Sequence, residues 1–218
     1  MTFKPKIVPI GDSAVLVQLG DEIDMRTNQR VYALVALINI SPLRGVIETV
    51  PSYTTLLIHY DLLILSFSQV KNYLRERITQ LHEGESHKPR RIVIPVRYGG
   101  EYGIDLEAVA HHCQLQAKDV IRIHSEKIYT VFMMGFTPGF PYIGKLDDAI
   151  IMPRLETPRT RVPAGTVAIA GSQTGIYPID SPGGWQLIGW TSLQLFSPKS
   201  ETPFLFSPGD EVKFIVEK

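Results

Sequence analysis

FMMGFTPGFPYIGKLDDAIIMPRLETPRTRVPAGTVAIAGSQTGIYPIDSPGGWQLIGW, residues 132–190, is the stretch that decides how this chain of 218 residues folds. Proline and glycine recur every few residues, yet aromatic and aliphatic side chains lie between them. A disordered segment would lack the apolar residues that offset the entropy cost of ordering. A regular helix or sheet tolerates few such breakers. The stretch therefore predicts a rigid, loop-rich surface between short strands, and loops held on a scaffold commonly carry binding sites.

The composition limits the classes of protein to which the chain can belong. Hydrophobic residues make up 44% and charged residues 20%, so a sizeable core can form, and 22 basic side chains balance 22 acidic ones. A nucleic-acid binder needs a basic surface, so this balance argues against one. A net charge near zero also favours association with a partner protein. The single cysteine, Cys113, allows no disulfide within the chain.

The hydropathy pattern gives no sign of a membrane segment. No apolar run approaches the length needed to cross a bilayer, and the opening residues, MTFKPKIVPIGD, lack the pattern of a signal peptide. We therefore expect a cytoplasmic protein that does not enter the membrane.

Residues 1–90 predict an α+β domain. Strands are expected at 4–10, 13–19, 45–50 and 54–60, with helices at 24–39 and 66–81. Asp24 is a suitable cap for the first helix, and Ser66 with Gln69 forms a capping-box pattern for the second. This order predicts a split β-α-β sandwich, with helices on one face of a mostly antiparallel sheet. The polar run HEGESHKPR, residues 82–90, is the best linker candidate, and a strand at 91–96 could belong to either side of it.

Residues 91–218 predict a mainly-β domain with a barrel-like arrangement and long loops. A tight turn at Tyr98-Gly99-Gly100 precedes two short helices, at 105–112 and 117–124. Short strands are expected at 128–134, 166–171, 186–191 and 212–216. The second short helix carries few basic residues, so we do not expect the helix pair to read a DNA groove.

Two motifs suggest chemistry that the neighbouring residues do not support. GFPYIGK, residues 139–145, has the spacing of a phosphate-binding loop. However, Leu146 stands where a hydroxyl should bind magnesium, and Pro141 removes a backbone donor. We expect an aromatic-lined turn instead, with Phe140 and Tyr142 packed or presented. His111-His112-Cys113 lacks a second cluster with ligand spacing, so no metal site is predicted.

The prolines around Arg154 and Arg159 favour a preformed anion site. Both arginines lie in PRLETPRTRVP, residues 153–163, where proline limits backbone freedom. Arginine presents a flat fork of donors that suits a carboxylate or a phosphate. The alternative is that these side chains pair with neighbouring acids such as Glu156.

A second cluster of candidates lies in GSQTGIYPIDSPGGW, residues 171–185. Gln173, Tyr177 and Ser181 can donate hydrogen bonds, and Trp185 can supply an aromatic wall. This combination is typical of a small-molecule pocket. A structural turn with buried tyrosine and tryptophan remains the alternative.

Three of these motifs resemble one known family. GFTPGFPYIG (135–144), PRLETPRTRVPAGTVAIAG (153–171) and QTGIYPIDSPGGWQLIG (173–189) are similar to the signature of the KipI / allophanate hydrolase subunit 1 family. That family includes the B subunits of bacterial 5-oxoprolinases, the PxpB-like proteins. IVPIGDSAVLVQLG (7–20) and VPSYTTLLIHYD (50–61) also resemble it, so the likeness covers nearly the whole chain. The resemblance implies an N-terminal α+β domain followed by a cyclophilin-like β-barrel domain.

The resemblance also implies an activity shared with other chains. In 5-oxoprolinase, a protein of this kind works with two others, the KipA-like (C) and PxpA-like (A) subunits, and the complex hydrolyses the lactam 5-oxoproline to glutamate with ATP. ATP is then a cofactor of the complex and need not bind to this chain, which alone is expected to be inactive. Two alternatives are a KipI-type inhibitor of a sporulation histidine kinase and a carboxyltransferase-type subunit of urea or allophanate metabolism. A barrel alone does not predict prolyl isomerisation.

The sequence departs from the family pattern at two places. Lys145 and Leu146 follow Gly144 where Gly-Gly-Leu is expected, and Trp190 stands in LIGWT where a basic residue is usual. If that position contacts an anionic substrate, Trp190 bears on the identity of the substrate.

We expect Arg154 or Arg159 to hold a substrate carboxylate, and Gln173, Tyr177 and the backbone of 181–184 to stabilise developing charge. Phe136 to Tyr142 would supply aromatic anchors for a kinase. No catalytic residue and no metal ligand is assigned. The candidates for binding substrate or partner are Phe136, Pro138, Phe140, Tyr142, Arg154, Arg159, Gln173, Tyr177, Ser181, Gly183, Gly184, Trp185 and Trp190.

Overall fold

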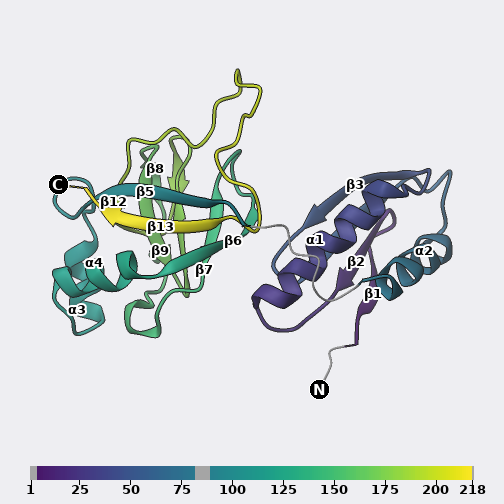
Figure 1. The fold of residues 1–218 in the computed structure, drawn as a ribbon, viewed down its shortest axis with the longest axis horizontal. Helices are drawn as coiled ribbons and strands as arrows, with labels where there is room; N and C mark the ends of the chain where they lie inside the picture. The colour runs from purple at the N-terminus through teal and green to yellow at the C-terminus, as the bar shows by residue number, and fades with distance from the viewer. Residues whose placement is uncertain (1–3, 82–88, 218) are drawn as a thin grey trace. The chain divides into compact units, whose positions relative to one another are not determined.

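The chain divides into two compact units, Met1–His87 and Lys88–Lys218. The structure, a computed structural model, describes residues 4–81 and 89–217, and Figure 1 shows their fold. Most of the predicted linker at 82–90 lies outside the described residues. Each unit has its own hydrophobic core.

The first unit is a four-stranded antiparallel sheet with two helices. Its elements are β1 (Lys6–Ile10), β2 (Ala14–Gln18), α1 (Met25–Ile40), β3 (Val46–Pro51), β4 (Thr55–Tyr60) and α2 (Phe67–Thr79). The strand order is β1-β2-β4-β3. Alternate residues of the central strands, such as Val15 and Val17, are buried with Leu34 of α1 and Leu74 of α2. Both helices therefore cover the same face of the sheet.

The sequence specifies both helix starts of this unit. The side chain of Asp24 accepts a hydrogen bond from the backbone nitrogen of Thr27 at 3.0 Å. Ser66 and Gln69 form the predicted capping box at the start of α2. These side chains satisfy backbone donors that have no partner inside the helix, so each helix begins where the capping residue stands.

The second unit is a closed seven-stranded barrel. Its elements are β5 (Arg91–Tyr98), α3 (Leu106–His112), α4 (Ala117–Glu126), β6 (Ile128–Met134), β7 (Pro141–Gly144), the 3-10 helix η1 (Asp148–Ile150), β8 (Arg159–Val162), β9 (Thr166–Ala170), β10 (Gln173–Ile176), β11 (Ser181–Gly183), β12 (Gln186–Trp190) and β13 (Glu211–Val216). The barrel order is β10-β7-β6-β13-β5-β12-β9, while β8 and β11 form a separate ribbon. Strand β5 pairs with β13 in parallel, so it belongs to the barrel. The predicted fold class, an α+β domain followed by a mainly-β barrel, is confirmed.

Four strands of the Pro/Gly-rich stretch were predicted as loops, and this prediction is wrong. They are β7, β8, β10 and β11. Pro141 opens β7, a position where a missing donor is tolerated. Gly175 lets β10 approach β7 closely, because a Cβ there would lie 2.8 Å from the Phe140 ring and 3.0 Å from the Pro141 carbonyl oxygen. The turn predicted at 139–145 is likewise mostly strand β7.

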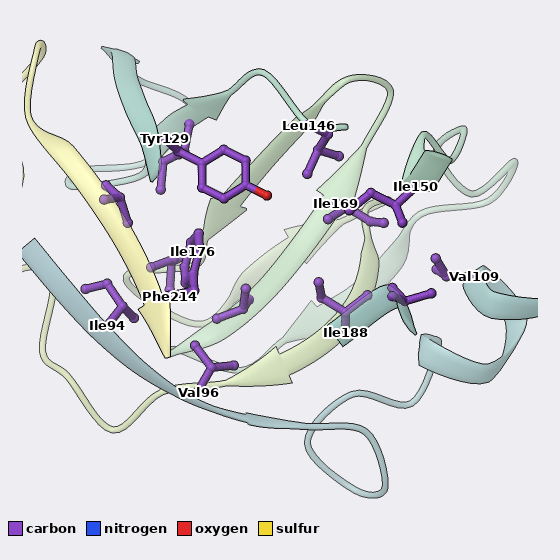
Figure 2. Close-up of a cluster of buried hydrophobic side chains, with 14 of the residues drawn as sticks. Ile94, Val96, Val109, Tyr129, Leu146, Ile150, Ile169, Ile176, Ile188 and Phe214 are labelled. Atoms are coloured by element: carbon purple, nitrogen blue, oxygen red, sulfur yellow. The ribbon is translucent and has the colours of Figure 1, made fainter. Parts of the chain in front are cut away.

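The barrel core consists of aliphatic side chains and the rings of Tyr129, Phe206 and Phe214, and it also holds one histidine network. In Figure 2, Ile94, Ile169 and Ile188 point inward from different strands, and Tyr129 and Phe214 belong to the same cluster. His124 of α4 is fully buried; its Nδ1 lies 2.7 Å from the Tyr98 hydroxyl and its Nε2 lies 2.9 Å from Oγ1 of Thr174. Oγ1 of Thr174 donates to the Ala168 carbonyl, so it accepts from Nε2, and the neutral imidazole satisfies both contacts.

This histidine is expected to make the barrel unstable in acid. Burial lowers the pKa of His124 to about 3. The unfolded chain takes up a proton below its ordinary value, about 6.5, and the folded chain does not, so stability is lost as the pH falls from that value toward 3. From pH 7 to pH 5 we expect a loss of about 2 kcal/mol from this group. Fluorescence of Trp185 and Trp190, both in the barrel unit, during denaturant unfolding measures it.

The matched control for this expectation is His124→Gln. This variant can be less stable at every pH, but its stability should fall by about 2 kcal/mol less than that of the wild type between pH 7 and pH 5. If the free energy of unfolding falls equally with pH in the wild type and the variant, His124 does not cause the acid sensitivity.

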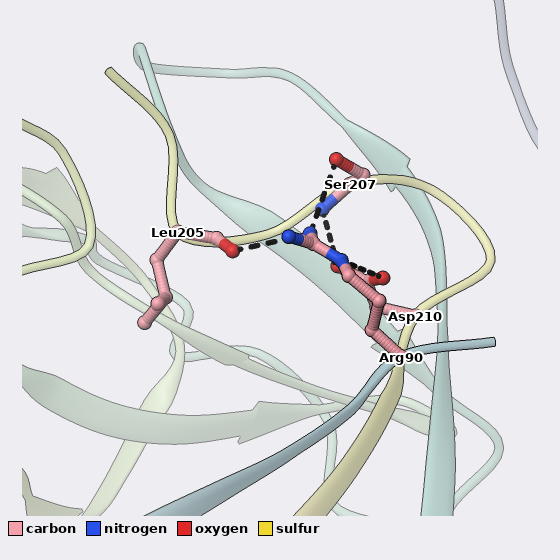
Figure 3. Close-up of polar contacts among 4 residues, drawn as sticks. All are labelled: Arg90, Leu205, Ser207 and Asp210. Atoms are coloured by element: carbon pink, nitrogen blue, oxygen red, sulfur yellow. Dashed lines mark hydrogen bonds and ion pairs between the residues drawn. The ribbon is translucent and has the colours of Figure 1, made fainter. Parts of the chain in front are cut away.

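The start of β5 is tied to the turn before β13 by an ion pair, which Figure 3 shows. The carboxylate of Asp210 accepts hydrogen bonds from Arg90 at 2.6 and 3.0 Å and from the backbone nitrogen of Ser207 at 2.7 Å. The Asp210 side chain is only 6% exposed. Its charge therefore depends on Arg90 for compensation.

Arg90→Ala is expected to lower the free energy of unfolding of the barrel by about 2 kcal/mol, because a buried carboxylate loses its charged partner. The adjacent Arg91 pairs with Glu211 in a more exposed position, so Arg91→Ala should cost less than about 1 kcal/mol. Denaturant unfolding of the two variants provides the comparison. Equal losses of unfolding free energy in the two variants would mean that the burial of Asp210 does not determine how much stability Arg90→Ala removes.

Candidate functional site

A cavity of about 280 Å³ in the barrel unit brings together most of the predicted binding residues. We call it the aromatic cavity. It is lined by Phe136, Phe140, Tyr142, Arg154, Leu155, Pro158, Tyr177, Pro182, Gly183, Gly184 and Trp185. The lining comes from the loop before β7, from β7 itself, from the segment before β8 and from the region of β11. These segments are far apart in the sequence, and the barrel places them around one hollow.

Phe140 is the centre of the aromatic wall. It is 1% exposed, and its ring meets those of Tyr142, Tyr177 and Trp185 edge-to-face, with centroids 5.0, 5.2 and 5.4 Å away. Edge-to-face packing fixes the orientation of each ring. The walls of the cavity are therefore formed before any ligand arrives.

Gly183 allows the backbone of β11 to close against this wall. A Cβ at this position would lie 2.1 Å from the Tyr177 hydroxyl oxygen. At Gly184 a Cβ would meet only Pro158 and the Leu155 carbonyl oxygen, at 3.6 Å or more. The glycine at 183 is thus required for the shape of the cavity, whereas the glycine at 184 is not.

Arg154 supplies the positive charge of the aromatic cavity. Its guanidinium carbon lies 5.9 Å from the centre of the Trp185 ring, a distance at which a cation is attracted to an aromatic face. Burial raises the pKa of Tyr142 and of Tyr177, and the charge of Arg154 acts in the opposite direction on both. Within the described part of the chain, Arg154 forms no ion pair. Its guanidinium is therefore available to an anion.

Arg159 has a different role. It forms an ion pair with Asp105 at 2.6 Å, and a second nitrogen donates to the Trp185 carbonyl at 3.4 Å. Asp105 also accepts a hydrogen bond from the backbone nitrogen of Leu187 at 2.7 Å. The alternative expectation, that an arginine of this motif pairs with an acidic side chain, is therefore correct for Arg159. Its partner is Asp105 rather than Glu156. The geometry favours Arg154 over Arg159 as the anion-binding residue.

The remaining candidates lie elsewhere. Pro138 lines a second cavity with Phe136. Trp190 and Arg159 line a third, where the Trp190 indole nitrogen donates to the Ala164 carbonyl at 2.8 Å. Gln173 lies in β10 opposite Gly144 and Ala170 and does not line the aromatic cavity.

Ser181 also lies outside the lining of the aromatic cavity, although it belongs to β11. It is 8% exposed, and its hydroxyl oxygen has no hydrogen-bond partner among the described residues. Of the group predicted to stabilise developing charge, Tyr177 and the Gly183-Gly184 backbone therefore face the cavity.

Leu155, Pro158 and Pro182 were not predicted from the sequence. They line the aromatic cavity with carbon atoms, and nothing in their chemistry distinguishes them from structural residues. Their position in the sequence, next to or near Arg154 and Gly183, was the signal that could have identified them as lining residues. With them, the cavity presents aromatic and aliphatic walls, tyrosine hydroxyls and one guanidinium, which suits a small flat anion.

Two further features concern the described residues: clusters of metal-ligating side chains and membrane-spanning helices. Within 4–81 and 89–217, His, Cys, Asp and Glu form no group of three that could hold a metal ion. No helix in the described ranges is both long and apolar enough to span a membrane.

Comparison with known proteins places the chain in a family. The sequence model described as "Carboxyltransferase domain, subdomain C and D" matches residues 5–206. The chain belongs to this carboxyltransferase family. Among its relatives, the 5-oxoprolinase B subunit of Bacillus subtilis (strain 168) is 44% identical over 99% of this chain and 94% of its own length. The resemblance inferred from the three motifs is thereby confirmed.

Solved structures show how the family fold is used. TTHA0988 is 38% identical with a TM-score of 0.81, and the match covers 94% of this chain but 39% of that one. The K. lactis urea amidolyase has a TM-score of 0.85 at 19% identity, over all of this chain and 15% of its own length. This second likeness concerns the fold alone. In both proteins the family fold is part of a longer polypeptide.

Proposed function

We propose that this chain is the B subunit of a 5-oxoprolinase and that its aromatic cavity binds the lactam substrate. The observation that carries the proposal is the guanidinium of Arg154, which forms no ion pair among the described residues and lies beside a rigid aromatic cavity of about 280 Å³. A relative that matches along nearly its whole length is the B subunit of a 5-oxoprolinase.

The chemistry of 5-oxoproline fits this cavity. The molecule is a flat five-membered lactam with one carboxylate. Arg154 can bind the carboxylate through paired hydrogen bonds, while the rings of Tyr142 and Trp185 flank the lactam. Urea carries no charge for Arg154 to bind, so the same geometry favours a carboxylated lactam over urea itself as the bound molecule.

The tyrosines of the cavity can assist the reaction as donors. Burial raises the pKa of Tyr177, so its hydroxyl stays protonated at neutral pH and can donate a hydrogen bond. A lactam carbonyl that gains negative charge is stabilised by such fixed donors. Tyr177 would therefore hold the carbonyl end of a substrate whose carboxylate contacts Arg154.

The aromatic cavity does not fit ATP. Among the described residues that line it, Arg154 is the single cation, and three phosphate groups would need several cations or a metal ion. The GFPYIGK segment offers no phosphate-binding loop, because Pro141–Gly144 is a barrel strand and no α-helix follows it directly. We therefore assign ATP to the complex and derive no step on this chain from it.

The other subunits would complete the site. No carboxylate or histidine lines the aromatic cavity, so the described residues offer no ordinary general base there. The KipA-like (C) and PxpA-like (A) subunits are the proposed companions. The kinase-inhibitor alternative gains little from the geometry, because Phe140, one of its expected anchors, is buried and only Phe136 is largely exposed, at 63%.

The test is reconstitution. The chain is mixed with its KipA-like and PxpA-like partners, 5-oxoproline and ATP, and glutamate is measured. We expect glutamate from the full mixture and none when this chain is omitted; urea in place of 5-oxoproline should give no product. A full mixture that forms no glutamate would overturn the proposal.

A further inference from the structure

A second cavity, of about 640 Å³, lies next to the aromatic cavity and shares Phe136 with it. We call it the Phe136–Phe204 groove. It is lined by Arg90, Met134, Gly135, Phe136, Thr137, Pro138, Gly139, Thr202, Pro203, Phe204, Phe206, Ser207 and Pro208. One wall is the loop between β6 and β7, and the other is the segment that precedes β13. All of these residues belong to the barrel unit.

The groove presents large apolar side chains to solvent. Phe136 is 63% exposed and Phe204 is 47% exposed. Phe136 also has a backbone φ of 66°, in the left-handed region that bulky side chains rarely adopt. An exposed ring held in a strained conformation is a reason to look for a function at that position. An apolar surface of this kind is characteristic of protein contact sites.

The walls of the groove are joined to each other. A Cβ at Gly139 would lie 2.9 Å from Cβ of Phe196, so glycine lets the loop pack on the neighbouring segment. The rings of Phe196 and Phe204 stack with centroids 5.3 Å apart, and a backbone hydrogen bond joins Leu205 to Leu195. The groove is thus formed in advance, which lowers the entropy cost of binding a partner.

The charge of the groove indicates what it accepts. Arg90 is the one charged residue among its described lining, and Asp210 and Ser207 already bind the guanidinium (Figure 3). An anionic group would have to compete with the buried carboxylate of Asp210. The groove therefore fits an uncharged segment that carries aliphatic, aromatic or proline side chains.

The lengths of related chains indicate which polypeptide carries that segment. In TTHA0988 this fold accounts for only 39% of the chain, so additional polypeptide is covalently joined to it. In this chain the match covers 94%, and its Bacillus relative of similar length is one subunit of 5-oxoprolinase. In that Bacillus relative, the polypeptide that TTHA0988 carries in addition to this fold is therefore expected to correspond to a separate subunit.

We propose that the Phe136–Phe204 groove is the docking surface for an apolar segment of the companion subunit, and that this segment lies beside the aromatic cavity. The inference rests on the proposed function for the identity of the companion, the KipA-like subunit. Because Phe136 belongs to both hollows, docking in the groove also fixes one wall of the substrate site.

The test uses sedimentation velocity to measure how tightly the chain binds the purified KipA-like subunit, without 5-oxoproline or ATP. Loss of a central aromatic contact weakens an interface about thirtyfold, so we expect this change in Kd for Phe204→Ser and for Phe136→Ser. Phe204→Leu should bind nearly as tightly as the wild type. The matched control is Ile215→Ser, because Ile215 is 43% exposed on β13 and does not line the groove.

Tight binding by both serine variants, or equal weakening by Ile215→Ser, would overturn the inference. Absence of binding by the wild type, or self-association of this chain that Phe204→Ser abolishes, would also overturn it. Circular dichroism confirms that each variant is folded. The outcome is separable from the proposed function, because a pair that binds through the groove yet forms no glutamate with the third subunit would refute the function and leave the docking surface intact.

Discussion

Arg154→Ala is expected to lower kcat/KM for 5-oxoproline about a hundredfold in the reconstituted complex. A hundredfold loss corresponds to about 2.7 kcal/mol, within the range for a charge-assisted, paired hydrogen bond to a carboxylate. The guanidinium faces a cavity with aromatic walls and forms no ion pair within the described residues, so no neighbouring cation of the cavity replaces it. Arg154→Lys should recover only part of the loss, because an ammonium group cannot bind both oxygens in the same plane.

The division of this effect between kcat and KM is informative. A residue that holds the carboxylate equally in the ground state and the transition state lowers KM and leaves kcat unchanged, so its removal raises KM alone. We expect that pattern for Arg154, because the carboxylate is not the group that reacts. Initial rates of glutamate formation over a range of 5-oxoproline concentrations measure both parameters.

Arg161→Ala is the matched control for Arg154. Arg161 belongs to the same PRLETPRTRVP motif, is 76% exposed and pairs with Asp180, and it does not line the aromatic cavity. Its removal should change kcat/KM by less than about twofold, because an exposed ion pair contributes little. Similar losses for the two variants would show that general positive charge, rather than a carboxylate contact at Arg154, promotes the reaction.

The N-terminal unit and the barrel helices were predictable because their signals are local. Asp24, Ser66 and Gln69 cap their helices through residues three positions away, and the apolar period of each segment identifies its buried face. Strands β7, β8, β10 and β11 carry no comparable local signal. Proline and glycine there serve contacts with distant strands, as Gly175 does against Phe140, and such contacts cannot be deduced from one segment.

The same distinction between local and distant information applies to the candidate site. Sequence chemistry identified Arg154, Tyr177 and Trp185, and the fold brings them around one cavity. It could not separate Arg154 from Arg159, because the acid that binds Arg159 lies 54 residues earlier, at the start of α3. His124 escaped notice for a related reason, since its partner Thr174 lies 50 residues away.

Gly183→Ala is expected to damage both the barrel and the aromatic cavity. The new Cβ would lie 2.1 Å from the Tyr177 hydroxyl and 2.7 Å from Cζ of that ring. Tyr177 is 1% exposed and packs against Phe140, so the ring cannot move away without disturbing the wall. Overpacking of this kind costs about 3 kcal/mol. Denaturant unfolding followed by tryptophan fluorescence measures the loss, and the affinity for 5-oxoproline should fall with it.

Gly184→Ala provides a control one residue away. Neither glycine has a backbone φ in the left-handed region, so the backbone strain of an added side chain is similar at the two positions. The nearest atom to a Cβ at 184 is a Pro158 carbon at 3.6 Å, an ordinary contact. This variant should unfold within about 1 kcal/mol of the wild type, and a larger loss would mean that the glycine pair is needed for its backbone rather than for the space beside Tyr177.

A second substitution tests the cause directly. In Gly183→Ala/Tyr177→Phe the hydroxyl oxygen that clashes at 2.1 Å is absent, while the ring carbon at 2.7 Å remains. The double variant should therefore be more stable than the sum of the two single losses predicts, by about 1 kcal/mol, because residues in contact are not additive. If the losses of unfolding free energy in the two single variants simply add up in the double variant, the contact with Tyr177 is not the reason that Gly183→Ala destabilises the barrel. A positive coupling would show that glycine at 183 is required because the Tyr177 hydroxyl occupies the space of a Cβ.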